Sequence, residues 1–250
     1  MIFLMILFGL THCVFGGGKE VPPGVVLCSR KHPKINDCVR NAIQETMPKF
    51  ISGIKSLDIP SLDPFHVDNL IIDSKRDDGS PVSIDLSWHN VNIKGIKSAK
   101  ITSAKADWDN NMVSFEAALT EPVDITGNYN IDGIILILPI KGTGTFDLKL
   151  EGFRAHIKVH GKEEMRDGDK YMMVDRLAFT FDIDHMEVHY YNLFNGDPVL
   201  GESMNSFLND NWRDIIAEMT PSVEASFSKY FEQVARKVFD HIPIDKIALP

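Results

Sequence analysis

Apolar and polar residues alternate along the middle of the chain, which is the pattern of strands that bury one face. The alternation is clearest in the segment 82–88, where the apolar positions are Val82, Ile84, Leu86 and Trp88. It predicts strands over residues 66–74, 82–88, 99–107, 112–119, 123–131, 134–140, 143–150, 154–161, 171–183 and 186–191. Hairpin-type turns are predicted at Asp78–Gly79, Asp132–Gly133, Gly142–Gly144 and Asp167–Gly168. Hairpin turns join antiparallel strands, so the sheet is expected to be antiparallel.

Helical periodicity marks both ends of this strand region. Residues 37–54 predict a first helix, with Asp37 as its cap and a kink or break at Pro48. Residues 204–241 carry the longest helical pattern, an apolar stripe at spacings of three and four that runs from Ile215 to Val238. Pro221 interrupts it, which predicts two helices or one bent helix, with the second part starting near Thr220.

These patterns together predict an α+β protein. A long sheet that is apolar on one side must cover that side, and the C-terminal helix is the element long enough to do so. A curved sheet wrapped around this helix would enclose it. Periodicity does not tell whether the space between sheet and helix is filled or hollow.

The N-terminus indicates export. Residues 1–10 are almost wholly apolar but too short to span a bilayer, and Gly16–Gly18 follow as small residues suited to cleavage. We therefore expect a signal peptide over residues 1–16 and a single domain over residues 17–250, secreted and without stable membrane insertion. The alternative is a buried N-terminal strand or helix. No Lys or Arg precedes the apolar run, as it does in a typical signal peptide.

Charge and cysteine content narrow the partners and the compartment. The net charge of −9 disfavours nucleic acid, because phosphate contact needs clustered Lys and Arg. Cys13 lies in the expected signal peptide, which leaves Cys28 and Cys38 as a single pair. In an oxidising compartment they are expected to form a disulfide that stabilises the fold by about 2–3 kcal/mol. The alternative, a metal pair, lacks two further ligands at useful spacing.

Catalytic and metal patterns are weak. Two pairs of histidines are four residues apart, His156 with His160 and His185 with His189, but both fall in strand patterns, where this spacing separates them by about 13 Å. The segment 201–205 resembles a nucleophile elbow around Ser203 but lacks the last glycine. We therefore expect no enzyme activity, no metal site and no cofactor.

Four segments in the right order resemble the takeout proteins of the juvenile hormone binding protein superfamily. They are Cys28 and Cys38 with the following IPSLDPF loop, the glycine-flanked strand GIILILPIKGTG at 133–144, the segment NLFNGDPVLGESMNSFLNDNW at 192–212, and VFDHIPIDKI at 238–247. The resemblance spans the mature chain. It implies a highly curved antiparallel sheet wrapped around a long C-terminal helix, as in tubular lipid-binding domains, with one short N-terminal helix.

The resemblance also implies a carrier that binds a small hydrophobic molecule, such as a terpenoid or a fatty-acid-like compound, in an internal apolar tunnel. The juvenile hormone binders have a second disulfide, which this chain lacks, and this difference puts juvenile hormone in doubt as its ligand. A lipophilic ligand and a monomer are expected, and a receptor is left open. The residues predicted to line the cavity are Phe50, Ile54, Trp88, Ile135, Ile137, Phe181, Phe227, Phe231, Val234 and Val238. The alternative is a secreted structural or signalling protein with a filled core that acts through its surface.

Overall fold

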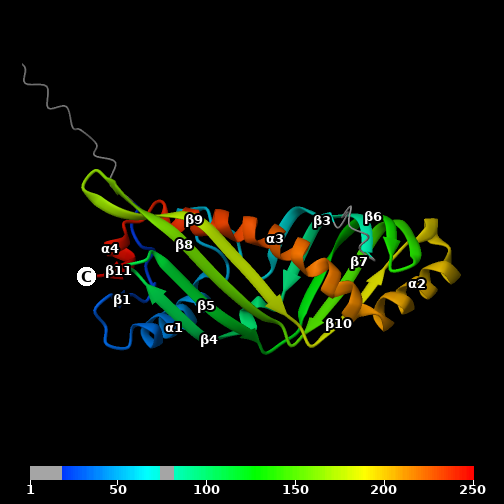
Figure 1. Cartoon of the computed structure of the whole chain (residues 1–250), viewed down its shortest axis with the longest axis horizontal. Coiled ribbons are helices and arrows are strands. Elements are labelled where there is room, and N and C mark those ends of the chain that lie inside the picture. Colours follow the sequence, from blue (N-terminus) through cyan, green and yellow to red (C-terminus); the bar gives the residue numbers. More distant parts are fainter. Residues whose placement is uncertain (1–18, 74–81) are drawn as a thin grey trace, which may run out of the picture.

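The computed structural model describes residues 19–73 and 82–250. Two antiparallel sheets lie end to end along an elongated molecule (Figure 1). One sheet has the order β10-β7-β6-β3-β2 and the other has the order β4-β5-β8-β9. The strands of the first are β2 Phe65–Asp73, β3 Val82–Lys94, β6 Val123–Ile135, β7 Leu138–Glu151 and β10 His185–Tyr190. Those of the second are β4 Ala99–Asp107, β5 Met112–Leu119, β8 Arg154–Arg166 and β9 Asp169–Asp182.

Four α-helices accompany the sheets in the described part of the chain: α1 Ile35–Thr46, α2 Pro198–Asp210, α3 Trp212–Phe239 and α4 Ile244–Ile247. The long helix α3 runs lengthwise across both sheets, α2 lies at one end of the molecule and α1 lies near the other (Figure 1). The predicted α+β fold is therefore confirmed, with the antiparallel strands β2 to β10 divided between two open sheets. No helix within residues 19–73 and 82–250 is both long and apolar enough to cross a bilayer.

Asparagine side chains of α2 cover the free edge of β10. Asn205 accepts a hydrogen bond from the backbone N–H of Tyr190 at 2.9 Å and donates one to its carbonyl oxygen at 3.0 Å. Asn209, one helical turn further, makes the same pair of bonds to Val188 at 2.8 and 2.9 Å. These amides replace a neighbouring strand, so the edge of the sheet is not left open for pairing.

The other sheet is held at its edges in a similar way. Along β9, the backbone N–H of Phe179 donates to Ser228 of α3 at 3.0 Å, and that of Phe181 donates to Glu224 at 3.1 Å. At the opposite edge, Gln44 of α1 accepts a 2.8 Å bond from the backbone of β4. Polar residues on the helices thus fix where each helix lies, while their apolar faces turn toward the interior.

The turn of the β6–β7 hairpin lies elsewhere than predicted. Asp132–Gly133 and Gly142–Gly144 were expected to be turns, but both lie within strands, and the chain reverses at Leu136 and Ile137. The glycines serve close backbone approach instead. A Cβ on Gly133 would lie 2.3 Å from the carbonyl oxygen of Ser83, and one on Gly144 would lie 2.3 Å from that of Tyr191. The turn predicted at Asp167–Gly168 is confirmed, and the one at Asp78–Gly79 lies outside the described residues.

The helix boundaries also differ from the prediction. Pro221 lies inside α3 without ending it, and the break comes at Asn211, whose φ of −111° and ψ of 20° are not helical. A proline inside a helix removes one backbone hydrogen bond and is destabilising. The packing of α3 against the core of both sheets offsets this cost. At the other end of the chain α1 starts at Ile35, before the predicted cap Asp37, and a 3₁₀ turn at Met47–Phe50 ends it where Pro48 predicted a break.

The N- and C-terminal segments are joined next to α1. Strand β1, Cys28–Ser29, pairs in parallel with β11, Ala248–Leu249. Cys28 is disulfide-bonded to Cys38 in α1, as predicted. The disulfide therefore ties α1 to the place where β1 and β11 pair. The signal peptide predicted for residues 1–16 lies outside the described residues.

Replacing Cys28 and Cys38 together with serine is expected to lower the free energy of unfolding by about 2–3 kcal/mol, because the closed loop no longer restricts the unfolded chain. Urea unfolding followed by circular dichroism measures the change. Mild reduction of the wild-type protein serves as a second route to the same state. Equal unfolding midpoints for the oxidised, reduced and serine forms would contradict a stabilising role.

Candidate ligand-binding cavity

A cavity of about 440 Å³ lies between α3 and the inner faces of the two sheets. It follows α3 from Ile215 to Phe239 and is lined by strands of both sheets. The alternation of apolar and polar residues in the sequence explains this lining. Every second side chain of a strand points toward the helix, and these side chains are the apolar ones. The result is a long apolar space along the axis of the molecule.

Aromatic rings from both layers meet in the middle of the cavity wall. Phe227 and Phe231 lie one turn apart on α3, and their ring centroids are 5.9 Å apart. Phe179 of β9 packs against both, at 5.8 and 5.2 Å. Phe65 at the start of β2 stacks on Phe231 from the other sheet, at 6.1 Å. This cluster joins the two sheets through α3.

Seven of the ten residues predicted for the wall line this cavity. They are Trp88, Ile135, Phe181, Phe227, Phe231, Val234 and Val238. The structure brings them together from β3, β6, β9 and α3. Their contact with a ligand stays a prediction.

Three predicted wall residues lie elsewhere. Ile137 was placed inward by extending the alternation of Ile135, but the chain turns at this point and the Ile137 side chain is 86% exposed, so that prediction is wrong. Phe50 and Ile54 were assigned to the first helix, which ends at Thr46. Ile54 packs instead in a separate cluster with Leu57, and neither residue lines the cavity.

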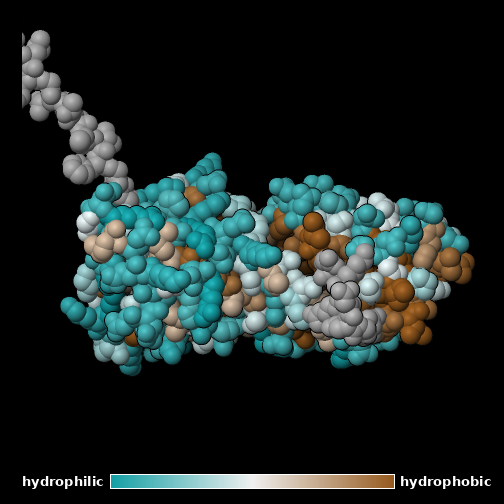
Figure 2. Space-filling model, turned by 45° about the horizontal axis from the view of Figure 1, so that its top comes forward, coloured by the Kyte–Doolittle hydropathy of each residue, from teal (hydrophilic) through white to brown (hydrophobic). Residues whose placement is uncertain are grey.

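The end of the molecule where α2 lies carries exposed apolar surface (Figure 2). The β6–β7 turn and the start of α2 contribute side chains that are at least half exposed: Ile134, Ile137, Val199 and Leu200. The apolar run 134–140 therefore supplies both buried and exposed residues. The composition of this run alone does not show which of its residues are buried and which are exposed.

Several wall residues that were not predicted from the sequence lie in the same alternating pattern as residues that were. Phe179 and Leu177 share the parity of Phe181 along β9, so the alternation that selected one of them selects all three. Phe65 is the first residue of β2, one position before the strand predicted over residues 66–74, and it had been assigned to the preceding loop. Periodicity along the chain does not show on which side the first residue of a strand lies.

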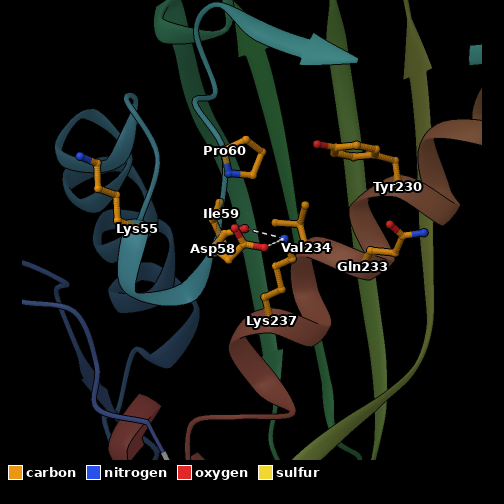
Figure 3. A pocket seen from close by; sticks show the side chains of 8 residues that line it. All are labelled: Lys55, Asp58, Ile59, Pro60, Tyr230, Gln233, Val234 and Lys237. Carbon is orange, nitrogen blue, oxygen red and sulfur yellow. Dashed lines mark hydrogen bonds and ion pairs between the residues drawn. The ribbon is translucent and has the colours of Figure 1, made fainter. Parts of the chain in front are cut away.

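A second pocket, of about 380 Å³, opens on the surface between α3 and the loop that follows α1 (Figure 3). Lys237 of α3 donates a hydrogen bond to a carboxylate oxygen of Asp58 at 2.8 Å and another to its backbone carbonyl. This bond and the positive charge of Lys237 hold the pKa of Asp58 below its ordinary value. Val234 lines both this pocket and the apolar cavity, so its side chain lies between the polar surface and the apolar interior.

The predicted histidine pairs lie on strands, His156 and His160 on β8 and His185 and His189 on β10. Among the described residues, no group of three or more His, Cys, Asp or Glu side chains is placed to hold a metal ion.

A family model described as haemolymph juvenile hormone binding protein matches residues 3–249. The chain belongs to this family. The resemblance to takeout proteins is likewise confirmed by a crystal structure, that of Takeout 1 from Epiphyas postvittana. It superposes with a TM-score of 0.75 at 28% identity and covers 90% of this chain and all of the other.

Two relatives within the juvenile hormone binding protein family match over most of their length. The circadian clock-controlled protein daywake of Drosophila melanogaster is 21% identical over 230 residues, which cover 86% of this chain and 85% of the relative. A protein of Schistocerca gregaria named "Putative beta-carotene-binding protein" is 21% identical over 225 residues, covering 90% of this chain and 88% of the relative. The similarity therefore extends across the whole domain.

Proposed function

We propose that this protein is a secreted, non-enzymatic carrier that holds one small lipophilic molecule in the cavity beneath α3. The observation that carries the proposal is the cavity itself, about 440 Å³ of space with an almost wholly apolar wall. Binding sites for small molecules are concave and mostly apolar, with few polar groups. Family membership and the name of the Schistocerca gregaria relative support the same reading.

The energetics suit a carrier. Each CH₂ group removed from water contributes about 0.8 kcal/mol, so burying a ligand of about 15 carbons contributes about 12 kcal/mol. After a binding cost of at least about 4 kcal/mol, up to about 8 kcal/mol remains, which corresponds to about micromolar affinity. The cavity also weighs against the alternative of a surface-acting protein with a filled core, because unfilled apolar space lowers stability unless a ligand occupies it.

Secretion is part of the proposal. The expected signal peptide, the disulfide between Cys28 and Cys38, and the haemolymph setting in the family's description support it. A disulfide persists in an oxidising compartment, whereas the cytosol reduces it.

The test uses the full chain expressed in a secreting eukaryotic host. We expect the protein in the medium, with its N-terminus at Gly17, and bound lipophilic molecules in a solvent extract analysed by mass spectrometry. After extraction, the apolar fluorescent probe N-phenyl-1-naphthylamine should bind with roughly micromolar affinity and be displaced by long-chain lipophiles. Absence of both extractable lipophiles and probe binding would overturn the carrier function.

A further inference from the structure

The wall of the cavity contains one polar place. Of the described residues that line it, only Trp88 and Tyr190 carry nitrogen or oxygen in their side chains, and the others are Ala, Val, Ile, Leu, Met or Phe. None of these described wall residues is Lys, Arg, His, Asp or Glu. Among the described wall residues, a polar group of a bound molecule therefore finds a side-chain partner only at Trp88 and Tyr190.

The fold brings these two residues together from separate strands. Trp88 is on β3 and Tyr190 is on β10, with β6 and β7 between them. The indole of Trp88 stacks on Phe146 of β7 with centroids 4.5 Å apart, and Phe146 lies 5.8 Å from the ring of Tyr190. Gly127 of β6 leaves room for the Phe146 ring. A Cβ atom at this position would lie only 3.2 Å from that ring.

The side-chain amide of Asn205 in α2 holds the backbone of Tyr190 in place. It accepts a hydrogen bond from the N–H of Tyr190 and donates one to its carbonyl oxygen. Tyr129, which packs edge-on against Tyr190 at 4.6 Å, uses its own hydroxyl to donate to the carbonyl oxygen of Tyr191 at 2.7 Å. The Tyr190 ring is thus positioned from two sides.

The indole N–H of Trp88 is unsatisfied. Trp88 is only 7% exposed, and its Nε1 atom is buried with no hydrogen-bond partner in residues 19–73 and 82–250. Burial raises the pKa of Tyr190, and the indole N–H of Trp88 partly offsets this rise. Both rings pack against Phe146, which lies between them in the wall. A buried donor without an acceptor costs free energy that an incoming acceptor recovers.

We infer that Trp88 and Tyr190 form a polar anchor that selects lipophilic ligands carrying one uncharged oxygen acceptor, such as a ketone, an ester or an alcohol. This inference rests on the proposed carrier function. The ligand oxygen accepts hydrogen bonds from Nε1 of Trp88 and from the hydroxyl of Tyr190, both of which are donors. The hydrocarbon part extends along α3 toward Phe227 and Phe231.

Two other ligand classes fit the wall less well. A pure hydrocarbon leaves the indole N–H unpaired, so it loses the gain that an oxygen provides. A carboxylate brings a full charge into a space where no described wall residue is a cation, and burying an unpaired charge is costly. The anchor therefore ranks uncharged oxygen compounds above both hydrocarbons and fatty-acid anions of equal length.

Three thirteen-carbon compounds test this ranking by displacement of N-phenyl-1-naphthylamine from the delipidated full chain: 2-tridecanone, tridecane and tridecanoate. We expect the ketone to bind about tenfold more tightly than the alkane, the effect of about one added hydrogen bond. We also expect it to bind more tightly than the carboxylate at neutral pH. In the infrared spectrum, the carbonyl stretch of ¹³C-labelled ketone should move to lower frequency on binding.

Substitutions locate the effect. Tyr190→Phe keeps the ring and removes the hydroxyl donor, whereas Trp88→Phe replaces the indole with a phenyl ring that has no donor. Each substitution should reduce the ratio of ketone affinity to alkane affinity, which corrects for any general change in apolar contact. Trp108→Phe is the matched control. The Trp108 indole N–H is also buried without a partner among the described residues, but Trp108 does not line the cavity. This variant should keep the full preference.

The outcomes separate the anchor from the carrier function. Equal affinity of the wild-type protein for ketone and alkane, or an unchanged preference in both donor variants, overturns the anchor and leaves the carrier intact. Failure of all three compounds and of the probe to bind overturns the carrier function instead. If a donor variant does not fold, the preference and the carbonyl shift of the wild-type protein still decide the question.

Discussion

Replacing Ala235 with phenylalanine is expected to weaken ligand binding strongly while the protein stays folded. Ala235 lies on α3 and lines the cavity beside the aromatic cluster, so a larger side chain there occupies space that a ligand needs. Forcing a ligand into overfilled space costs about 1–3 kcal/mol, which lowers affinity about fivefold to 150-fold. Displacement of N-phenyl-1-naphthylamine measures the loss, and thermal unfolding shows whether the fold persists.

The same helix supplies a matched control. Ala225 is also on α3 but is exposed, so Ala225→Phe adds the same side chain on the outer face. Its affinity should equal that of the wild type. If Ala235→Phe binds as tightly as Ala225→Phe, the ligand does not occupy the space beneath α3, and the proposed site is wrong.

Replacing Ile140 with alanine is expected to lower the free energy of unfolding by about 2–5 kcal/mol. Ile140 on β7 is 1% exposed and belongs to the main core, so its truncation removes buried contacts and leaves a void. Urea unfolding of the purified protein provides the measurement.

Ile137→Ala is the comparison that makes this result informative. Both isoleucines come from the apolar run 134–140, but Ile137 is 86% exposed in the turn. Its truncation should change the free energy of unfolding by no more than about 0.5 kcal/mol. Equal effects at the two positions would mean that the hairpin has a different register from the one described.

The parts of the wall that lie on regular elements could be predicted from the sequence. Phe227, Phe231, Val234 and Val238 follow from the helical spacing alone, because a residue's face on a helix depends on its position in the repeat. Trp88 on β3 follows from strict alternation over a long strand in the same way. At such positions, local pattern and final environment agree.

The errors lie where regular elements end. Ile137 was misplaced because a turn of two apolar residues carries no polar signal, and the nearby glycines serve close strand contacts rather than turns. Ile54 was misplaced because its apolar spacing continues past the end of α1, which stops at Thr46. In both cases periodicity was extended beyond the element that produces it.

The sequence by itself determined the antiparallel strands with one apolar face, the long apolar helix that covers them, the pairing of Cys28 with Cys38, and the family. Each depends on residue spacing or on residue identity along the chain. Only the tertiary structure decided that the antiparallel strands β2 to β10 form two sheets, that a cavity remains beneath α3, and that Trp88 and Tyr190 both lie in its wall. The physical reason is that a hollow depends on the distance between layers. That distance is set by contacts between residues far apart in the chain, such as those of Asn205 with β10 and Ser228 with β9.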